Sequence, residues 1–91
     1  MGRSETPKRP VAVVFGDGVP ELLQELPEKV RHQAGQLIEL LSLNPYMYEV
    51  RRRGLMRGRR SFQVDRYRFY YSVSSAEVRI DAIIPAGMRN P

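Results

Sequence analysis

The sequence predicts one small α+β domain, in the order β-α-α-β-β-β, with a helical pair packed on a mainly antiparallel sheet. Apolar residues recur with helical period between positions 20 and 43, and apolar and polar residues alternate along 61–73 and 77–85. A chain of 91 residues has room for a single hydrophobic core. We therefore assign residues 11–91 to one domain, preceded by a flexible polar arm at 1–10 that contains two prolines.

The first half of the chain predicts a strand followed by two helices. The stretch VAVVF at 11–15 is mostly β-branched and is closed by GDG, which indicates a buried strand. Pro27 interrupts the helical pattern because it lacks a backbone donor, so we predict a short helix over 20–25 and a longer one over 27–43. Asn44-Pro45 ends the second helix. The predicted apolar stripe comprises Leu22, Leu26, Val30, Ala34, Leu37 and Leu41.

The second half predicts two β-hairpins whose registers follow from the apolar pattern. A two-residue turn at Asp65-Arg66 sets Val64 opposite Tyr67 and, with the same register, Phe62 opposite Phe69. A slip by one residue would place apolar residues opposite polar ones. The second turn, at SSAE, pairs Val73 with Val78 and continues through Tyr71–Ile80, Phe69–Ala82 and Tyr67–Ile84.

These registers also predict which residues lie on the opposite, uncovered face of the sheet: Ser61, Gln63, Arg68, Tyr70, Ser72, Arg79, Asp81 and Ile83. Three further arginines lead into this face, namely Arg57, Arg59 and Arg60. Guanidinium groups bind phosphate in bidentate fashion, and an exposed tyrosine ring stacks on nucleic-acid bases. Both residues also have a possible structural role instead of nucleic-acid binding: Tyr70 can stabilise the hairpin as a cross-strand partner, and Arg68 can form a salt bridge with Asp81 or Asp65.

The charge distribution points to a polyanionic partner. Residues 17–49 carry a net charge of −4, whereas residues 51–71 carry eight arginines and one acid, within a chain of net charge +5. Arginines that serve only general stability would be spread along the chain, whereas a clustered basic segment is typical of proteins that bind nucleic acid.

Several other classes are excluded or disfavoured by composition. The chain has no cysteine and one histidine, so we expect neither a disulfide framework nor a zinc finger, and no metal or cofactor. His32 has no nucleophile or metal ligand near it in sequence and is most simply an exposed helix residue. No apolar run is long enough to span a bilayer and no signal peptide is evident, so we expect a cytoplasmic protein without membrane contact.

Three stretches together resemble the RelE/ParE superfamily of toxins from toxin–antitoxin modules: LPEKVRHQAGQLIELLSLNP, RRRGLMRGRRSFQVDRYRFYYSV and EVRIDAIIP. They match a leucine-spaced helix that ends in Asn-Pro, a hairpin with a Tyr-Arg-x-x-Tyr segment, and the last strand of the family. The resemblance implies a small RelE-like fold, similar to that of microbial ribonucleases. It also implies a cognate antitoxin as partner.

A RelE-like toxin inhibits translation by cleaving messenger RNA on the ribosome, without a metal. The resemblance assigns Arg68 to the scissile phosphate and suggests catalytic roles for Tyr70 and Arg89. The nucleic-acid-binding candidates are Arg57, Arg59, Arg60, Ser61, Gln63 and Arg79. The chain departs from the family pattern, because RelE has lysines where Ser61 and Gln63 stand, and no tyrosine or histidine follows Arg89. Two alternatives therefore stay open: a ParE-like inhibitor of DNA gyrase, and a family member that only binds RNA or antitoxin.

Overall fold

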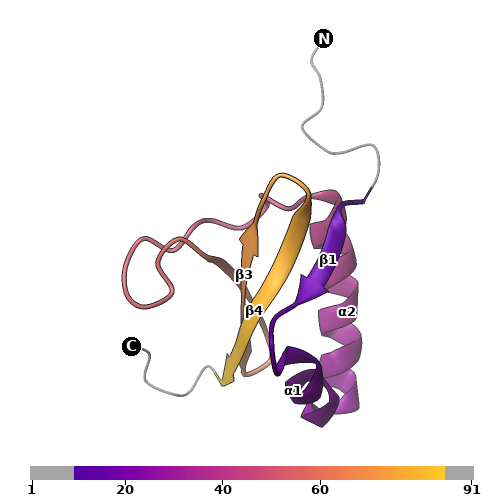
Figure 1. The fold of residues 1–91 in the computed structure, drawn as a ribbon. Helices are drawn as coiled ribbons and strands as arrows, with labels where there is room; N and C mark the ends of the chain where they lie inside the picture. Colours follow the sequence, from indigo (N-terminus) through magenta and orange to yellow (C-terminus); the bar gives the residue numbers. More distant parts are fainter. Residues whose placement is uncertain (1–9, 86–91) are drawn as a thin grey trace.

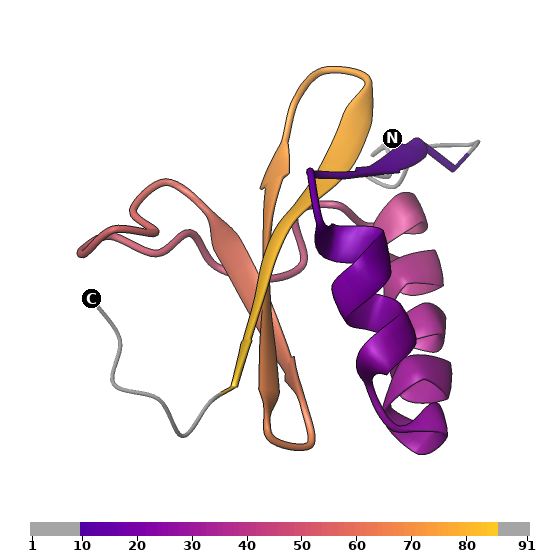
Figure 2. The same cartoon turned by 60° about the horizontal axis from the view of Figure 1, so that its bottom comes forward.

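Residues 10–85 are described by a computed structural model and form four strands and two helices (Figure 1). The elements are β1 (Ala12–Phe15), α1 (Val19–Glu25), α2 (Glu28–Leu43), β2 (Arg60–Val64), β3 (Tyr67–Val73) and β4 (Glu77–Pro85). The four strands make one sheet in the order β1-β4-β3-β2, and Figure 2 shows both helices on one side of it. The predicted α+β fold is confirmed. Positions 1–9, most of the predicted arm, lie outside the described residues, as does Arg89.

Pro27 divides the helical region as predicted. Leu26, just before it, has extended backbone (ψ 153°), because proline disfavours helical geometry in the preceding residue. The break changes the phase of the apolar stripe: Val19 of α1 and Leu26, which follows this helix, are buried, but Leu22 is 43% exposed. The expectation that Leu22 continues the stripe of α2 is therefore wrong. Neither helix in this part of the chain is both long and apolar enough to cross a bilayer.

Strand β1 lies at the edge of the sheet rather than in its interior. It pairs with β4 alone, in parallel, from Ala12 opposite Glu77 to Phe15 opposite Ile80. An edge strand has a neighbour on one side only, and Phe15 is 40% exposed. The prediction of a buried first strand is thus wrong, although Val13 does pack against the core.

The first hairpin register is confirmed and the second only near its turn. Val64 lies opposite Tyr67 and Phe62 opposite Phe69, with the turn residue Asp65 at φ 54°. In the second hairpin the pairs Val73–Val78 and Tyr71–Ile80 are as predicted, but a β-bulge between Tyr70 and Tyr71 then shifts the register by one residue of β4. Beyond it the pairs are Tyr70–Ala82, Phe69–Ile83, Arg68–Ile84 and Tyr67–Pro85, so the predicted partners Phe69–Ala82 and Tyr67–Ile84 are wrong.

The bulge has a simple packing reason. Without it, strict alternation would bring Ala82 to the helix side after Ile80, and Ile83 would face away from the core. With one extra residue in β4, both Ile80 and Ile83 are buried in the core. The core is completed by a stack of aromatic rings, in which the centroids of Phe62 and Phe69 lie 4.9 Å apart.

Tyr71 ties β3 to the end of α2. Its ring is fully buried, and its hydroxyl donates a hydrogen bond of 3.2 Å to the carbonyl oxygen of Pro45. Burial raises the pKa of Tyr71 to about 12, and the nearby Arg60 opposes that rise. Because an unfolded tyrosine has a pKa of about 10, the native state keeps a proton that the unfolded chain loses between pH 10 and 12. Stability is therefore lost as the pH rises through this window.

We expect the free energy of unfolding to fall more steeply in the wild type than in Tyr71→Phe above pH 10. At neutral pH the variant is less stable by about 1 kcal/mol, because the carbonyl of Pro45 loses its donor. By pH 11 the wild type has lost about 1 kcal/mol more than the variant has. Urea unfolding at pH 7, 9, 10 and 11 measures both curves. Parallel curves would show that Tyr71 does not carry the alkaline sensitivity.

Candidate nucleic-acid interface

Among residues 10–85 both helices lie on the same side of the sheet, and we call the other side the open face (Figure 2). Residues of β2, β3 and β4 that alternate with the core residues point to this side. They comprise Ser61, Gln63, Arg68, Tyr70, Arg79 and Asp81. Arg59, which immediately precedes β2, belongs to the same face because it contacts Asp81.

Arg68 is held on the open face by neutral groups. Its Nη2 donates to Oε1 of Gln63 at 2.8 Å, and its Nη1 donates to Oγ of Ser61 at 3.3 Å. Within residues 10–85 no carboxylate lies within ion-pair distance of this guanidinium, and it stays partly exposed. The alternative in which Asp81 or Asp65 neutralises Arg68 is therefore wrong. Ser61 and Gln63, predicted as RNA-binding residues, fix the position of a cation whose charge is available to a ligand.

A second cationic group surrounds Asp81. Nε of Arg59 lies 3.1 Å from Oδ2 of this carboxylate, and Nε of Arg79 lies 3.5 Å from Oδ1. The Asp81 side chain is 14% exposed, whereas the two arginine side chains are 41% and 49% exposed. The structure therefore brings together the predicted candidates Arg59 and Arg79 through an acid that sequence reasoning had not assigned to them. No local sequence signal reveals this arrangement, because Arg59 and Asp81 are 22 residues apart.

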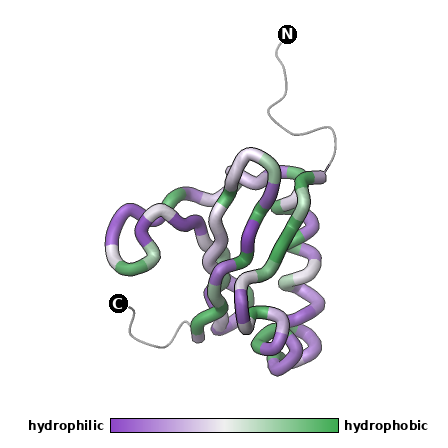
Figure 3. The backbone as a smooth tube through the Cα atoms, in the orientation of Figure 1, coloured by the Kyte–Doolittle hydropathy of each residue, from purple (hydrophilic) through white to green (hydrophobic). Residues whose placement is uncertain are grey.

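The segment 51–59 forms an ordered loop, here called the arginine loop, that extends from the open-face side of the sheet (Figures 1 and 2). Its neck is closed by backbone bonds from Arg51 N to Arg59 O (2.6 Å) and from Gly58 N to Arg51 O (2.9 Å). Gly54 and Gly58 adopt positive φ values of 86° and 89°, which only glycine adopts without strain. The tube in Figure 3 shows a mostly hydrophilic loop with an apolar tip, where Leu55 is 73% exposed.

Arg57, a predicted nucleic-acid-binding residue, is exposed on this loop. Arg52 and Arg53 are exposed as well, while Arg51 is partly covered and donates from Nε to the carbonyl of Arg53 at 3.0 Å. The loop thus presents three exposed guanidinium groups beside the open face. It is the most concentrated positive charge among the described residues.

Two residues predicted for the open face are covered. Tyr70 on β3 is only 1% exposed. The prediction that this ring is available for stacking on a base is therefore wrong. Ile83 is 8% exposed and packs in the core, since the bulge turns it toward the helices. The expectation that Ile83 lies on the uncovered side is also wrong.

Arg60 lies on the opposite side of the sheet from its neighbours Arg59 and Ser61. It lies two residues before Phe62 on β2 and therefore on the same face as that core residue. Its Nη1 donates to the carbonyl of Tyr48, and its guanidinium carbon lies 5.0 Å from the ring centre of Tyr46. This cation–π contact fixes the connector between α2 and the arginine loop. The prediction that Arg60 lines the same surface as Arg57 and Arg59 is thus wrong.

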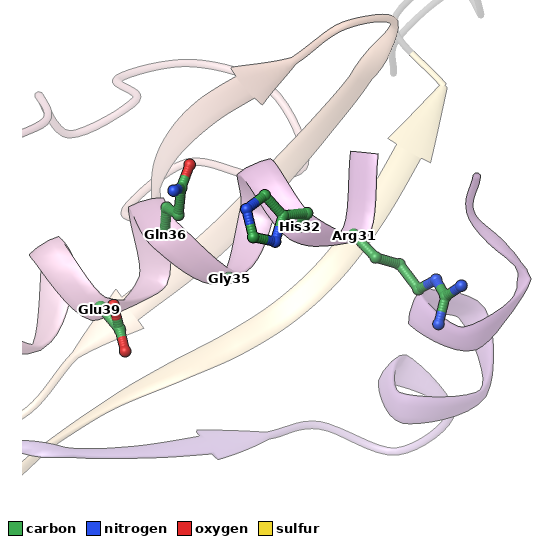
Figure 4. A pocket seen from close by; sticks show the side chains of 5 residues that line it. All are labelled: Arg31, His32, Gly35, Gln36 and Glu39. Atoms are coloured by element: carbon green, nitrogen blue, oxygen red, sulfur yellow. The ribbon is translucent and has the colours of Figure 1, made fainter. Parts of the chain in front are cut away.

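The only histidine of the chain does not take part in this surface. His32 is exposed on α2 and lines a shallow hollow with Arg31, Gly35, Gln36 and Glu39 (Figure 4). The guanidinium of Arg31 extends away from the histidine, and its Nε donates to the carbonyl of Leu26 at 3.2 Å. The plain interpretation of His32 as an exposed helix residue agrees with its position.

Comparison with known proteins gives a match in structure only. No protein-family model and no curated protein matches the sequence. The fold matches a chain of the RelBE2 toxin–antitoxin complex of Mycobacterium tuberculosis at a TM-score of 0.70 and 22% identity, over 84% of this chain and 98% of that one. It matches the intact RelBE toxin–antitoxin complex of E. coli at 0.72 and 15% identity, over 86% and 99%. The archaeal RelE–RelB complex of Pyrococcus horikoshii OT3 matches at 0.65 and 20%, over 87% and 98%.

These matches cover nearly the whole of each solved chain, so no large part of the known fold is missing here. The two helices on a four-stranded, mostly antiparallel sheet correspond to the arrangement in those complexes. The chain therefore has the fold of the RelE toxins, as its leucine-spaced helix and Tyr-Arg-x-x-Tyr hairpin predicted.

Proposed function

We propose that this protein is a RelE-like toxin that inhibits translation by cleaving messenger RNA on the ribosome. The observation that carries the proposal is the guanidinium of Arg68, which Ser61 and Gln63 hold on the open face without a neutralising carboxylate. The fold match to three RelBE complexes supports the toxin class. The clustered arginines of the arginine loop supply the attraction to a polyanion.

In the proposed reaction the 2′-oxygen of a nucleotide attacks its own 3′-phosphorus, and the bond to the 5′-oxygen of the next nucleotide breaks. One proton leaves the 2′-hydroxyl and one is added to the departing oxygen. The phosphorus passes through a state with extra negative charge, which a fixed guanidinium stabilises by two parallel hydrogen bonds. A guanidinium group is a poor proton shuttle, so Arg68 acts through charge rather than as an acid or base. Arg89 is proposed as a second cation for the same phosphate.

The test is expression in a bacterial host, followed by mapping of messenger RNA 5′ ends. Growth arrest with new ends inside translated regions supports the proposal. Growth arrest with intact messenger RNA and blocked DNA supercoiling would instead identify a gyrase inhibitor. Normal growth would leave a protein that binds RNA or antitoxin without toxic activity.

We further propose a cytoplasmic antitoxin partner whose acidic segment covers the arginine loop. The three matched structures are toxin–antitoxin complexes, and the loop offers the positive charge that such a segment requires. The leucines at 22, 40 and 43 are exposed on the helices and offer apolar anchor points for the same partner.

Replacing Arg52, Arg53 and Arg57 with glutamine is expected to weaken antitoxin binding about tenfold or more at low salt, since each charge contact contributes to association. The partner is the product of the neighbouring gene, and calorimetry of the purified pair at two salt concentrations measures the effect. Arg66→Gln, in the exposed turn between β2 and β3, is the control for the loss of one charge and is compared with the single variant Arg57→Gln. Binding that is insensitive to both salt and the triple substitution would contradict the proposed acidic segment.

A further inference from the structure

The ion pairs around Asp81 involve only one nitrogen atom of each arginine side chain. Both contacts are made by Nε, one to each carboxylate oxygen, at 3.1 Å for Arg59 and 3.5 Å for Arg79. Within residues 10–85 the terminal nitrogens of these two side chains have no hydrogen-bond or ion-pair partner. Asp81 is the better covered partner: it accepts a hydrogen bond from Nε of Arg59 and lies at ion-pair distance from Arg79, and the two arginine side chains are 41% and 49% exposed.

This geometry differs from an ordinary closed salt bridge. A carboxylate that neutralises an arginine most effectively takes two parallel bonds from one guanidinium. The carboxylate of Asp81 instead contacts Nε of two guanidinium groups and does not contact their terminal amino groups. Two arginines and one aspartate give the cluster a net charge of +1. Two fixed guanidinium edges are suited to a tetrahedral oxyanion such as phosphate, which accepts bonds from several directions.

The cluster is separate from Arg68 but lies on the same face. Arg79 is paired with Ser72 across β3 and β4, and Ser72 is four residues from Arg68 along β3. Four residues of strand span about 13 Å, which is more than one phosphate group can bridge. The two cationic groups are therefore placed for different phosphates of one strand.

We propose that Arg59 and Arg79 form a second phosphate-binding site for single-stranded RNA, and that Asp81 is its positioning residue. The site rests on the proposed action on RNA and extends it, because a second contact sets the direction in which the strand crosses the sheet. Arg68 holds the phosphate that reacts, and the Arg59–Arg79 pair holds another phosphate of the same strand.

The experiment measures binding of a fluorescent nine-nucleotide RNA, 2′-O-methylated so that it is not cleaved, to the full chain at several salt concentrations. Arg59→Gln and Arg79→Gln are each expected to weaken binding and to lower the slope of log affinity against log salt by about 0.7, the value for one lost phosphate contact on a single strand. Asp81→Asn is expected to weaken binding about threefold, although it removes a negative charge, because the guanidiniums lose their support. In the Arg59→Gln/Arg79→Gln background the same substitution has no further effect.

Glu77 provides the matched control. It lies on β4 two residues before Arg79, so the alternation of the strand places it on the same face as Arg79. It makes no ion pair in the part of the chain described. Glu77→Gln removes the same charge and is expected to leave the affinity for RNA unchanged or slightly raised. Asp81→Asn is instead expected to lower that affinity. Circular dichroism confirms that the variants are folded.

Three results would overturn the second site. Tighter binding by Asp81→Asn would mean that the carboxylate competes with phosphate. Unchanged salt slopes in both arginine variants would mean that neither arginine contacts the RNA backbone. Failure of the wild-type protein to bind the oligonucleotide at low salt would mean that the site does not exist. The proposed cleavage is judged separately on ribosomes: a protein that binds as expected but cleaves nothing keeps the second site and loses the nuclease function.

Discussion

Replacing Arg68 with alanine is expected to lower the rate of the proposed cleavage of ribosome-bound messenger RNA about 100-fold or more. Removal of a single fixed donor to a developing oxyanion has an effect of this size in enzymes that act by charge stabilisation. Ser61 and Gln63 hold the Arg68 side chain in place by hydrogen bonds. The alanine variant therefore lacks a positioned positive charge that no carboxylate of residues 10–85 neutralises. Cleavage is measured by primer extension on purified ribosomes, with toxicity in the host as a second readout.

Arg66→Ala is the matched control, because Arg66 is an exposed arginine in the turn of the same hairpin, two residues away. It changes the net charge equally and is expected to cleave at close to the wild-type rate. Arg68→Lys keeps the charge but cannot donate two parallel hydrogen bonds to a phosphate. Its cleavage rate is therefore expected to lie between those of Arg68→Ala and Arg66→Ala. Equal rates for Arg68→Ala and Arg66→Ala would remove Arg68 from the reaction.

The largest expected effect on stability belongs to Phe69→Ala. The ring is fully buried and is stacked on Phe62, with an angle of 11° between the two planes. Removal of a buried phenylalanine ring costs about 3–5 kcal/mol. That is comparable to the whole stability of a small domain, so we expect Phe69→Ala to be largely unfolded at 37 °C.

Urea unfolding followed by circular dichroism measures this loss. Leu55→Ala, at the 73% exposed tip of the arginine loop, is expected to unfold within about 0.5 kcal/mol of the wild type. Phe69→Leu keeps most of the volume and gives a measurable intermediate value if the alanine variant does not fold. A Phe69→Ala protein as stable as Leu55→Ala would show that the core is not centred on these stacked rings.

Much of the fold is local in origin, and the sequence predicts those parts well. Pro27 breaks the helical region wherever the rest of the chain lies, because proline cannot donate its backbone bond. The two-residue turn at Asp65-Arg66 sets Phe62 opposite Phe69, and a slip by one residue would place apolar residues opposite polar ones. These elements were predicted to within a residue or two at their ends.

The candidate site was predicted in part, and the bulge in the sheet accounts for one of the errors. Arg68, Ser61 and Gln63 were placed correctly because their hairpin has a short turn and a regular register. The bulge opposite Tyr70 depends on how Ile83 fits the core, and no alternation rule applied to the sequence reveals it. Ile83 was therefore assigned to the wrong side, and the Arg59–Asp81 contact was not foreseen.

The parallel pairing of β1 with β4 also has a consequence for synthesis of the protein. Strand β4 lies in the interior of the sheet and supplies Val78 and Ile80 to the core, yet it is the last strand of the described chain. A nascent polypeptide that has not yet released this strand from the exit tunnel has hairpin and helices but no closed core. The four-stranded sheet therefore closes only after β4 has left the exit tunnel.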